Sequence, residues 1–302
     1  MTASLGICPQ TCYWYPDKKC LGDAMIARDN LINAHLPEDE VGDYSFTAVG
    51  QGGAEPAGKT YAYHAHHRAQ LFQIVRGSLR LETEGGYFVV PPERGVFVPS
   101  GVLHEVTYLQ ETERSYLFFR PEAVADLPMQ VSVIGTTPLL RELILAFLEI
   151  PRSDAGGPPA ERLAAVIIDQ LQTSPVAPLS LPSPMSDRLR TIATDIRDEP
   201  GEEWPLQELA SRAAMSSRSF QRHFQSETGM SFRAWRQQAK LLKAVEWLAA
   251  GKSVGDIAFS LGYSGSSAFI AVFRAAFGTS PGQYFQGTPT GCRSGAATNS
   301  AE

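Results

Sequence analysis

The chain has 302 residues, of which 43% are hydrophobic and 19% are charged, and its formal net charge is −6. This composition is typical of a globular protein with room for two domains, each able to bury its own core. No apolar run approaches the ~18 residues that a membrane span needs, and the first twenty residues lack the apolar core of a secretory signal. We therefore expect a cytoplasmic protein that does not contact a membrane.

The N-terminal arm, residues 1–44, contains Cys8, Cys12 and Cys20, and Cys292 lies near the other end of the chain. Their spacing matches no zinc signature, and a reducing cytosol disfavours disulfides. Two interpretations stay open: unpaired thiols on a loosely ordered arm, or a thiol sensor.

Residues 45–135 are predicted to form an antiparallel β-sandwich or barrel. Short β-branched and aromatic runs alternate there with glycine turn signals. The segment Arg80–Tyr87 has the pattern of a hairpin between half-buried strands. Strands this short and closely spaced favour an all-β unit.

The stretch "YHAHHRAQL", Tyr63–Leu71, holds three histidines in nine residues. It could be a metal site, a catalytic site or a polar corner of a strand. Because side chains alternate along a strand, we expect His67 to point away from the face that carries His66.

Residues 136–172 change to a helical period, in "LLRELILAFLEI" and "ERLAAVIIDQLQ". The first helix is apolar nearly all round, so it needs two partners. One partner is its own domain, and a second subunit is a candidate for the other, which predicts a homodimer; burial within one chain is the alternative. Residues 173–184 are proline-rich and are predicted to be an extended linker.

Residues 185–287 are predicted to be all-α and to contain an internal repeat. Leu209 and Ala210 match Ile257 and Ala258 at an offset of 48, whereas Phe220 and Phe224 match Phe269 and Phe273 at an offset of 49. Each copy is a short helix, a tight turn, a second helix and a glycine, which is a helix-turn-helix. The final residues, 288–302, are small and polar and are predicted to be disordered.

The second helix of each copy presents a distinct outward face. In the first copy the spacing i, i+3, i+4, i+7 places four polar side chains on one face, opposite Phe220 and Phe224: Arg218, Gln221, Arg222 and Gln225. Arginine pairs with guanine and glutamine with adenine in the major groove; a merely solvated polar face is the alternative.

The second copy offers a less polar set to DNA: Ser267, Ile270, Ala271 and Arg274. Ile270 and Ala271 can contact thymine methyl groups but cannot make bidentate hydrogen bonds, and Arg274 suits a phosphate. We therefore expect the first copy to carry most of the base discrimination.

A single helix between Ser231 and Gly251 is predicted to join the two copies, with Ser231 as its N-cap and Gly251 as its stop. Its basic side chains, Arg233, Arg236, Lys240 and Lys243, are expected to remain outside. Such a connector would hold two recognition helices about 34 Å apart, one duplex turn.

The charge distribution supports a nucleic-acid partner for the C-terminal part. Residues 182–287 hold 12 Lys and Arg against 10 Asp and Glu, a net of +2, whereas residues 1–181 hold 13 against 21, a net of −8. An electrostatic footprint is local, so this asymmetry matters more than the total.

These helical repeats resemble the DNA-binding domain of the AraC/XylS family of bacterial transcription regulators, over roughly residues 183–286. The resemblance implies a transcription regulator that binds promoter DNA, with a small-molecule-responsive N-terminal domain and RNA polymerase as a candidate partner. In the family, the positions of Arg218, Gln221 and Arg222 contact bases. Ala271 departs from the polar or basic residue often found at its position.

The N-terminal part resembles the cupin-type sensor of that family. One cupin motif is matched by His64, His66 and Gln70, and the second by "GVFVPSGVLH", which ends at His104. The resemblance implies that three imidazoles and one amide converge inside a β-barrel, as a site for zinc, nickel, manganese or iron. Gln70 departs from the usual glutamate, which weakens a hard-metal site. A bound metal, a metal-free effector pocket and a structural polar cluster all stay open.

The overall expectation is an α+β multidomain regulator whose cupin-like domain senses a small molecule or a metal ion and signals to the DNA-binding half through residues 138–172. A metal-dependent cupin enzyme fused to a DNA-binding module is the alternative. Against it, Glu105 should face away from the histidines because it directly follows His104 on a strand. An architectural DNA protein without an effector is a third hypothesis.

Overall fold

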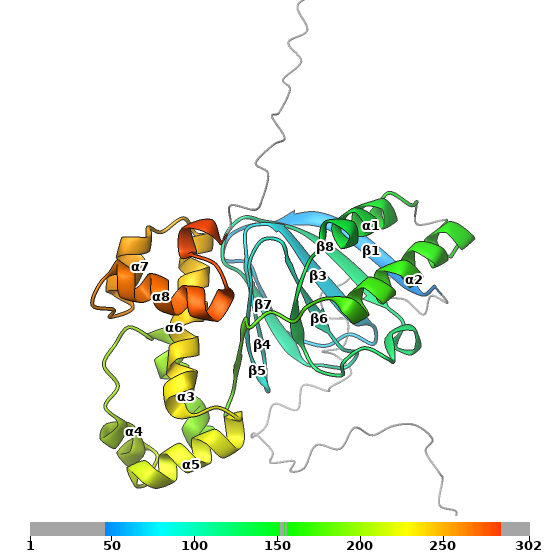
Figure 1. The fold of residues 1–302 in the computed structure, drawn as a ribbon. Helices are drawn as coiled ribbons and strands as arrows, with labels where there is room; N and C mark the ends of the chain where they lie inside the picture. The colour runs from blue at the N-terminus through cyan, green and yellow to red at the C-terminus, as the bar shows by residue number, and fades with distance from the viewer. Residues whose placement is uncertain (1–45, 152–153, 155, 285–302) are drawn as a thin grey trace, which may run out of the picture.

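The computed structural model describes residues 46–151, 154 and 156–284, which form a β-rich part and a helical part (Figure 1). The predicted arm, the predicted tail and all four cysteines lie outside these residues. The strands are β1 (Ala48–Glu55), β2 (Thr60–His64), β3 (Ala69–Arg76), β4 (Leu79–Thr83), β5 (Gly86–Val90), β6 (Arg94–Val98), β7 (His104–Tyr108), β8 (Thr112–Phe119), β9 (Ser132–Gly135) and β10 (Ser180–Pro182).

The strands form two five-stranded antiparallel sheets. The first sheet has the order β1-β8-β3-β6-β9, and the second has the order β10-β5-β4-β7-β2. Among the described residues no strand pairing closes the two sheets into one barrel, so the architecture is the sandwich-like form of the predicted fold. The predicted hairpin is present as β4 and β5, with Leu81 opposite Phe88.

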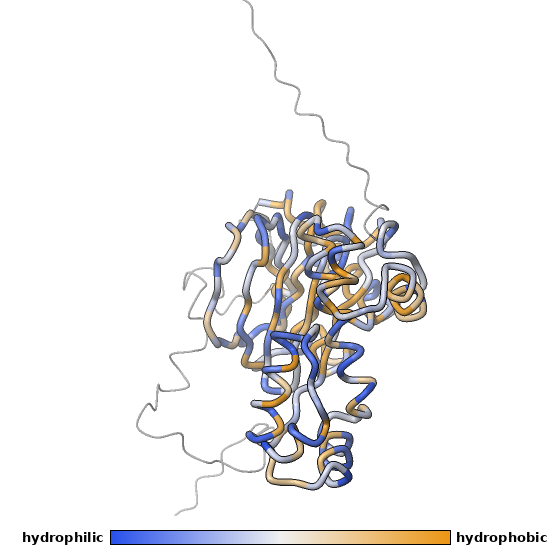
Figure 2. Tube along the Cα trace, turned by 90° about the vertical axis from the view of Figure 1, so that its left-hand side faces the viewer, coloured by the Kyte–Doolittle hydropathy of each residue, from blue (hydrophilic) through white to orange (hydrophobic). Residues whose placement is uncertain are grey.

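Strand alternation gives each sheet an inner and an outer face, and polar and apolar residues are interleaved along the strands (Figure 2). On β7 the residues alternate between buried and half-buried, with His104, Val106 and Tyr108 buried. The apolar space between the sheets is filled by fully buried side chains such as Leu79, Leu81 and Val96. This interior is the part of the fold into which the cupin-like motifs are placed.

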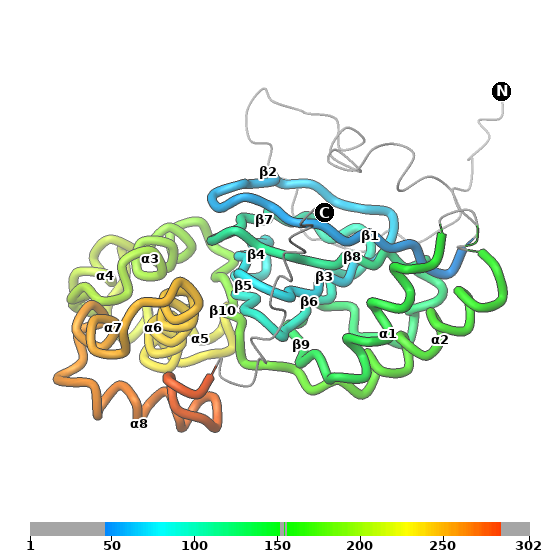
Figure 3. Tube along the Cα trace, turned by 90° about the horizontal axis from the view of Figure 1, so that it is seen from above, coloured from blue at the N-terminus to red at the C-terminus, as the bar shows by residue number. Residues whose placement is uncertain are grey.

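Helices α1 (Pro138–Leu148) and α2 (Pro158–Thr173) cover the outer face of the first sheet (Figure 3). They bury Ile144, Phe147 and Ile167 against Leu71 and Leu117 of the strands. The opposite side of the helix pair leaves large apolar side chains exposed: Leu139, Leu145 and Val166. Helix α1, which the sequence predicted to be apolar nearly all round, thus packs on the first sheet with one face and exposes apolar side chains on the other.

The predicted linker is more ordered than an extended connection. Its residues Ser180–Pro182 form strand β10, which pairs with β5 at the edge of the second sheet. A sheet edge exposes unpaired backbone groups, and an extended proline-rich segment can satisfy them. The proline spacing predicted the extended conformation but not this partner, because strand pairing depends on a distant edge.

The helical part consists of α3 (Asp187–Asp198), α4 (Leu206–Arg212), α5 (Ser217–Thr228), α6 (Phe232–Ala249), α7 (Val254–Ser260) and α8 (Ser266–Phe277). The repeat is present: α4 and α7 have 7 residues each, and α5 and α8 have 12 each. The extra residue of the second copy lies in the turn, since 213–216 separate α4 from α5 and 261–265 separate α7 from α8. Gly229 and Gly278 end the second helices in the left-handed conformation.

The molecule therefore has successive layers: α1 and α2, the first sheet, the second sheet, and the helical part (Figure 3). Helix α6 packs on β10 and β5, and α3 lies beside it. Helices α1 and α2 lie on the far side of the sandwich, so the route through residues 138–172 that the sequence suggested is not the contact between the two parts. Within the described residues, no helix is both long and apolar enough to span a membrane.

Gly50 allows β1 to approach α1 closely. A Cβ at this position would lie 2.6 Å from Leu148 and 2.8 Å from Leu117, whereas a Cβ at Gly52 would lie 3.6 Å from Leu148. We expect Gly50→Ala to lower the free energy of unfolding by about 1–3 kcal/mol through overpacking, and Gly52→Ala to have a much smaller effect. Urea denaturation of both variants measures this difference; equal effects would show that α1 does not depend on the close approach.

Candidate functional site

Three histidines from two segments of the chain meet between the two sheets. His64 ends β2, His104 begins β7, and these two residues are paired across the strands. His66 follows β2, and its ring centroid lies 4.8 Å from that of His64 and 5.4 Å from that of His104. One potential ligand nitrogen from each of the three buried side chains lies within 4.8 Å of the others. The sequence-predicted triad is therefore brought together.

Backbone carbonyls fix the tautomers of two of these imidazoles. The Nδ1 atoms of His64 and His104 lie 2.8 Å from the carbonyl oxygens of Ala62 and Val102 respectively. A carbonyl oxygen only accepts, so in each neutral ring Nδ1 donates and Nε2 keeps the lone pair. This arrangement is common for histidines that bind metals through Nε2.

The loop at residues 99–103, which precedes His104, positions that residue through hydrogen bonds to the segment that carries His66. The amide of Gly101 donates to the carbonyl of His66 over 2.9 Å, and Ser100 Oγ donates to the carbonyl of His67 over 2.6 Å. Gly101 has φ +75°, a conformation that glycine adopts without strain. These bonds hold the 99–103 loop against the segment that carries His66.

The environment of His104 favours its neutral imidazole. Burial, with a smaller effect of His64, lowers the pKa of His104 from 6.5 to about 4. The Nε2 atom of His104 is buried and has no hydrogen-bond partner within the described part of the chain. A buried lone pair without a donor is costly, and a metal ion or a ligand donor would satisfy it.

Gln70 faces the same interior from β3. It is buried, and it lies across the strands from Phe118, whose ring is 5.4 Å from that of His66. Its Oε1 atom has no partner among the described residues. His67 is exposed, and Glu105 lies opposite Glu82 in the strand register, on the outer face of the second sheet. The side chains of His67 and Glu105 therefore point away from the triad.

A second polar cluster at the other end of the interior was not anticipated from the sequence. Arg114 donates to Glu55 over 2.7 Å, and its guanidinium group lies 3.8 Å from the ring centroid of Tyr116. Tyr116 and Tyr108 are joined by a hydrogen bond between their hydroxyls. Burial raises the pKa of Tyr116 to about 12. Alternation on β8 could have suggested that Arg114 faces inward, but only the pairing of β1 with β8 brings Glu55 to it.

Helix α5 presents the predicted polar face to solvent. The four side chains of that face are all exposed: Arg218, Gln221, Arg222 and Gln225. Phe220 and Phe224, on the opposite face, are fully buried against Phe232 and Trp235. The N-cap is Ser216, whose Oγ accepts from the amide of Ser219.

Helix α8 repeats this arrangement with a different surface. Ser267, Ala271 and Arg274 are exposed and Ile270 is half-buried, while Phe269 and Phe273 are fully buried. The exposed face of α8 thus offers one guanidinium group and small side chains, in contrast to the two arginines and two glutamines of α5.

The connector α6 differs from the prediction in its basic residues. Arg233 is exposed, but Arg236, Lys240 and Lys243 are half-buried and donate to groups within the chain. Arg236 and Lys240 donate to the carbonyls of Trp204 and Leu261, which belong to the two helix-turn-helix units. These two residues therefore attach the units to α6 instead of forming a free basic surface.

Comparison with known proteins agrees with this division. Residues 53–184 match a family model described as an AraC-like ligand binding domain, and residues 209–287 match one described as a helix-turn-helix domain. The HTH-type transcriptional regulator NimR of Escherichia coli is 34% identical over 225 residues, which cover 74% of this chain and 82% of NimR. The transcriptional activator RclR of the same organism is 26% identical, with 70% and 82% covered. The structure of ToxT from Vibrio cholerae aligns over 79% of this chain and 97% of its own, at 12% identity and a TM-score of 0.34.

The lowered pKa of His104 makes the stability of the metal-free protein depend on pH. Above pH 6.5 the imidazole is neutral in both the folded and the unfolded chain. Below that pH only the unfolded chain binds the proton, so the free energy of unfolding should fall by about 3 kcal/mol as the pH decreases from 6.5 to about 4.

Chelator-treated protein, unfolded by urea across this pH range, measures the effect. His104→Gln should remove most of this pH dependence, whereas His67→Gln, at an exposed position, should retain it. The same slope in wild type and His104→Gln would contradict the assignment.

Proposed function

The chain belongs to the AraC family of helix-turn-helix transcriptional regulators, and we propose that it reads promoter DNA mainly through α5 while its histidine pocket binds the effector. A helix-turn-helix DNA-binding part and a ligand-binding part are both present. The observation that carries the proposal is the exposed arginine and glutamine face of α5. The opposite face of this helix packs into the core of the duplicated unit through buried phenylalanines.

Direct readout is assigned to the first unit because its exposed groups match base edges. Arg218 and Arg222 can each donate two hydrogen bonds to guanine, and Gln221 and Gln225 can pair with adenine. Phe220 and Phe224 are locked in the core, so the helix presents these four groups on a rigid support. A rigid support lowers the conformational entropy lost on binding.

The second unit is assigned mainly to the DNA backbone. Arg274 is placed to neutralise a phosphate, which fixes register without reading sequence. Ile270 and Ala271 offer only apolar contacts, which suit thymine methyl groups.

The pocket is proposed to bind a divalent metal ion through Nε2 of His64 and His104 and a ring nitrogen of His66. The fixed tautomers, the low pKa and the unpaired Nε2 of His104 support this assignment. Three neutral imidazoles suit zinc, and nickel, manganese and iron are the other candidates. Gln70 would add a neutral oxygen or bind an organic effector beside the metal.

No catalysis is proposed, because Glu105, the acid nearest in sequence to His104, lies on the outer face of its sheet.

A homodimer through the open apolar face of α1 and α2 is proposed from Leu139, Leu145 and Val166. RNA polymerase as a further partner and a cytoplasmic location follow from the role of a transcription regulator.

Replacing the base-reading side chains should abolish specific binding. We expect Arg218→Ala/Gln221→Ala/Arg222→Ala to weaken the affinity for a duplex selected by the wild-type protein from a random library by at least 100-fold, since each bidentate contact contributes about 1–3 kcal/mol. Fluorescence anisotropy at fixed salt concentration measures this loss.

The matched control is Arg76→Ala/Gln207→Ala/Arg188→Ala, which removes the same groups from exposed positions outside α5. It should retain near wild-type affinity. Full affinity of the first variant would refute the assignment of base reading to α5.

Zinc should stabilise the chelator-treated protein. At a free concentration of 100 times the dissociation constant, a bound ion adds about 2.7 kcal/mol to the free energy of unfolding, which thermal melting detects as a higher Tm. His66→Gln should lose the effect and His67→Gln should keep it. If zinc, nickel, manganese and iron(II) all leave the wild-type melting temperature unchanged, the metal assignment fails and the histidines form a metal-free effector pocket or a structural polar cluster.

A further inference from the structure

The second sheet carries the pocket on one face and the helical part on the other. Its inner face presents His64 and His104 to the triad, and Leu81 and Phe88 to the interior. Strand register places Glu82 opposite Tyr87 and Glu105, so these three side chains share the outer face. One layer of backbone therefore separates the histidines from the side chains that meet the DNA-binding half.

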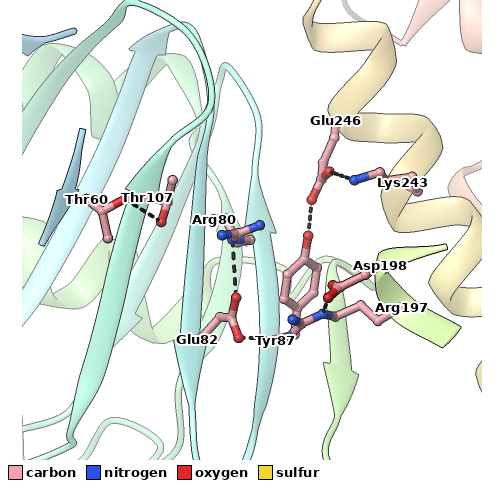
Figure 4. Close-up of polar contacts among 9 residues, drawn as sticks. All are labelled: Thr60, Arg80, Glu82, Tyr87, Thr107, Arg197, Asp198, Lys243 and Glu246. Carbon is pink, nitrogen blue, oxygen red and sulfur yellow. Dashed lines mark hydrogen bonds and ion pairs between the residues drawn. The ribbon is translucent and has the colours of Figure 1, made fainter. Parts of the chain in front are cut away.

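Tyr87 is the centre of the contact on that outer face (Figure 4). Its hydroxyl donates to Oε1 of Glu246 on α6, and Oε2 of Glu246 accepts from Lys243 over 3.1 Å. Glu246 is only 5% exposed, and burial with the nearby Glu246 charge raises the pKa of Tyr87. A buried carboxylate is stable only while such partners remain in place.

An ion-pair chain lies directly beside this contact. Arg197 of α3 donates to Glu82 of β4 over 2.7 Å, and Glu82 also pairs with Arg80 over 3.2 Å. The Arg197 guanidinium group lies 4.8 Å from the ring centroid of Tyr87, so Arg197 contacts both Glu82 and the tyrosine that bonds Glu246. We name the set Glu82, Tyr87, Arg197 and Glu246 the latch.

Strand β10 completes the connection between sheet and helices. Trp235 Nε1 donates to the carbonyl of Pro182 over 2.7 Å, and Gln238 donates to that of Pro178 over 2.7 Å. Both donors belong to α6, the helix that packs against α3, α5 and α7. A shift of β5 or β10 is therefore passed to the one helix that joins the two helix-turn-helix units.

We propose that the latch is the route by which occupancy of the pocket changes DNA affinity: a ligand that moves the inner face of the second sheet alters the grip of Tyr87 and Glu82 on α6 and α3. This inference rests on the proposed function in one respect, since it takes the histidine pocket as the effector site. The recognition faces of α5 and α8 remain exposed while the latch is closed. The latch thus sets the placement of the two units and does not cover their DNA surface.

The chemistry of the latch suits a reversible switch. Its hydrogen bonds and ion pairs can be replaced by bonds to water when the surfaces part, whereas the buried Glu246 carboxylate needs its partners while the contact is closed. Coupling between sites needs an element with two accessible states that both ligands bias. Buried apolar residues around the latch, such as Leu181 and Trp235, hold the sheet against α6, while the polar bonds of the latch are the part of the contact that can exchange with water.

The test compares the full chain with a Tyr87→Phe/Glu246→Gln variant. The dissociation constant for the selected duplex is measured without zinc and at saturating zinc. In wild type we expect zinc to change this constant at least 5-fold, in either direction, and in the variant less than 2-fold. The zinc dissociation constant of the DNA-free variant should stay within about 3-fold of wild type, because no pocket residue is altered.

A matched control removes the same groups elsewhere. Tyr263→Phe/Glu113→Gln deletes a hydroxyl that bonds Gln237 within the helical part and an exposed carboxylate on β8. It should keep the full effect of zinc on DNA binding. If Tyr87→Phe/Glu246→Gln does not fold by circular dichroism, Arg197→Gln takes its place, since it breaks the Glu82 ion pair at a partly exposed position.

Each outcome decides between the proposals. If zinc binds and the latch variant keeps the wild-type response, the latch proposal is overturned while the pocket assignment stands. If zinc does not bind wild type, the metal assignment fails, and a Phe88→Leu substitution replaces zinc as the perturbation of the inner face. That substitution should then change DNA affinity at least 3-fold with the latch intact and less than 2-fold without it; equal changes in both backgrounds would overturn the latch.

Discussion

Strand alternation in the second sheet is the constraint on which the rest of the structure depends. Because successive side chains point to opposite faces, a sheet only one residue thick presents His104 to the pocket and Glu105 to the outside. A slip of one residue in the pairing would exchange these faces and separate the triad. The pairing of His64 with His104 follows a register shift between Tyr61 and His64, so this irregularity of β2 also helps to bring the two histidines together.

The two faces of this sheet place different demands on their side chains. The inner face is apolar around the triad, and burial there lowers the pKa of His104, which favours its neutral imidazole. The outer face carries tyrosine and charged residues, which meet complementary groups on α3 and α6. Burial thus favours a neutral His104 on one face, while the other face makes hydrogen bonds and ion pairs to the helical part.

The first sheet supports this arrangement from the other side. Helices α1 and α2 cover its outer face with a separate apolar core. The second sheet, in contrast, shares one buried apolar cluster with the helical part, which includes Leu181 of β10 and Trp235 of α6. Phe220 and Phe224 extend the same cluster into the first helix-turn-helix unit.

What could be predicted from the sequence was local or periodic. The helix-turn-helix repeat with its change of offset, the Ser231 cap and the hairpin at β4 and β5 are all present. These features depend on backbone geometry and on side-chain spacing over a few residues, which any single chain displays directly. The histidine motifs could be located for the same reason, and the family resemblance supplied the expectation that they meet in space.

The tertiary structure decided the features that join distant segments. Tyr87 and Glu246 are 159 residues apart, and nothing in the pattern around either residue names the other. The same holds for the pairing of β10 with β5, for Arg114 with Glu55, and for the capture of Arg236 and Lys240 by the two units. The energy of such contacts depends on which surfaces packing brings together, so periodicity fixes which face a residue occupies and only the fold selects its partner.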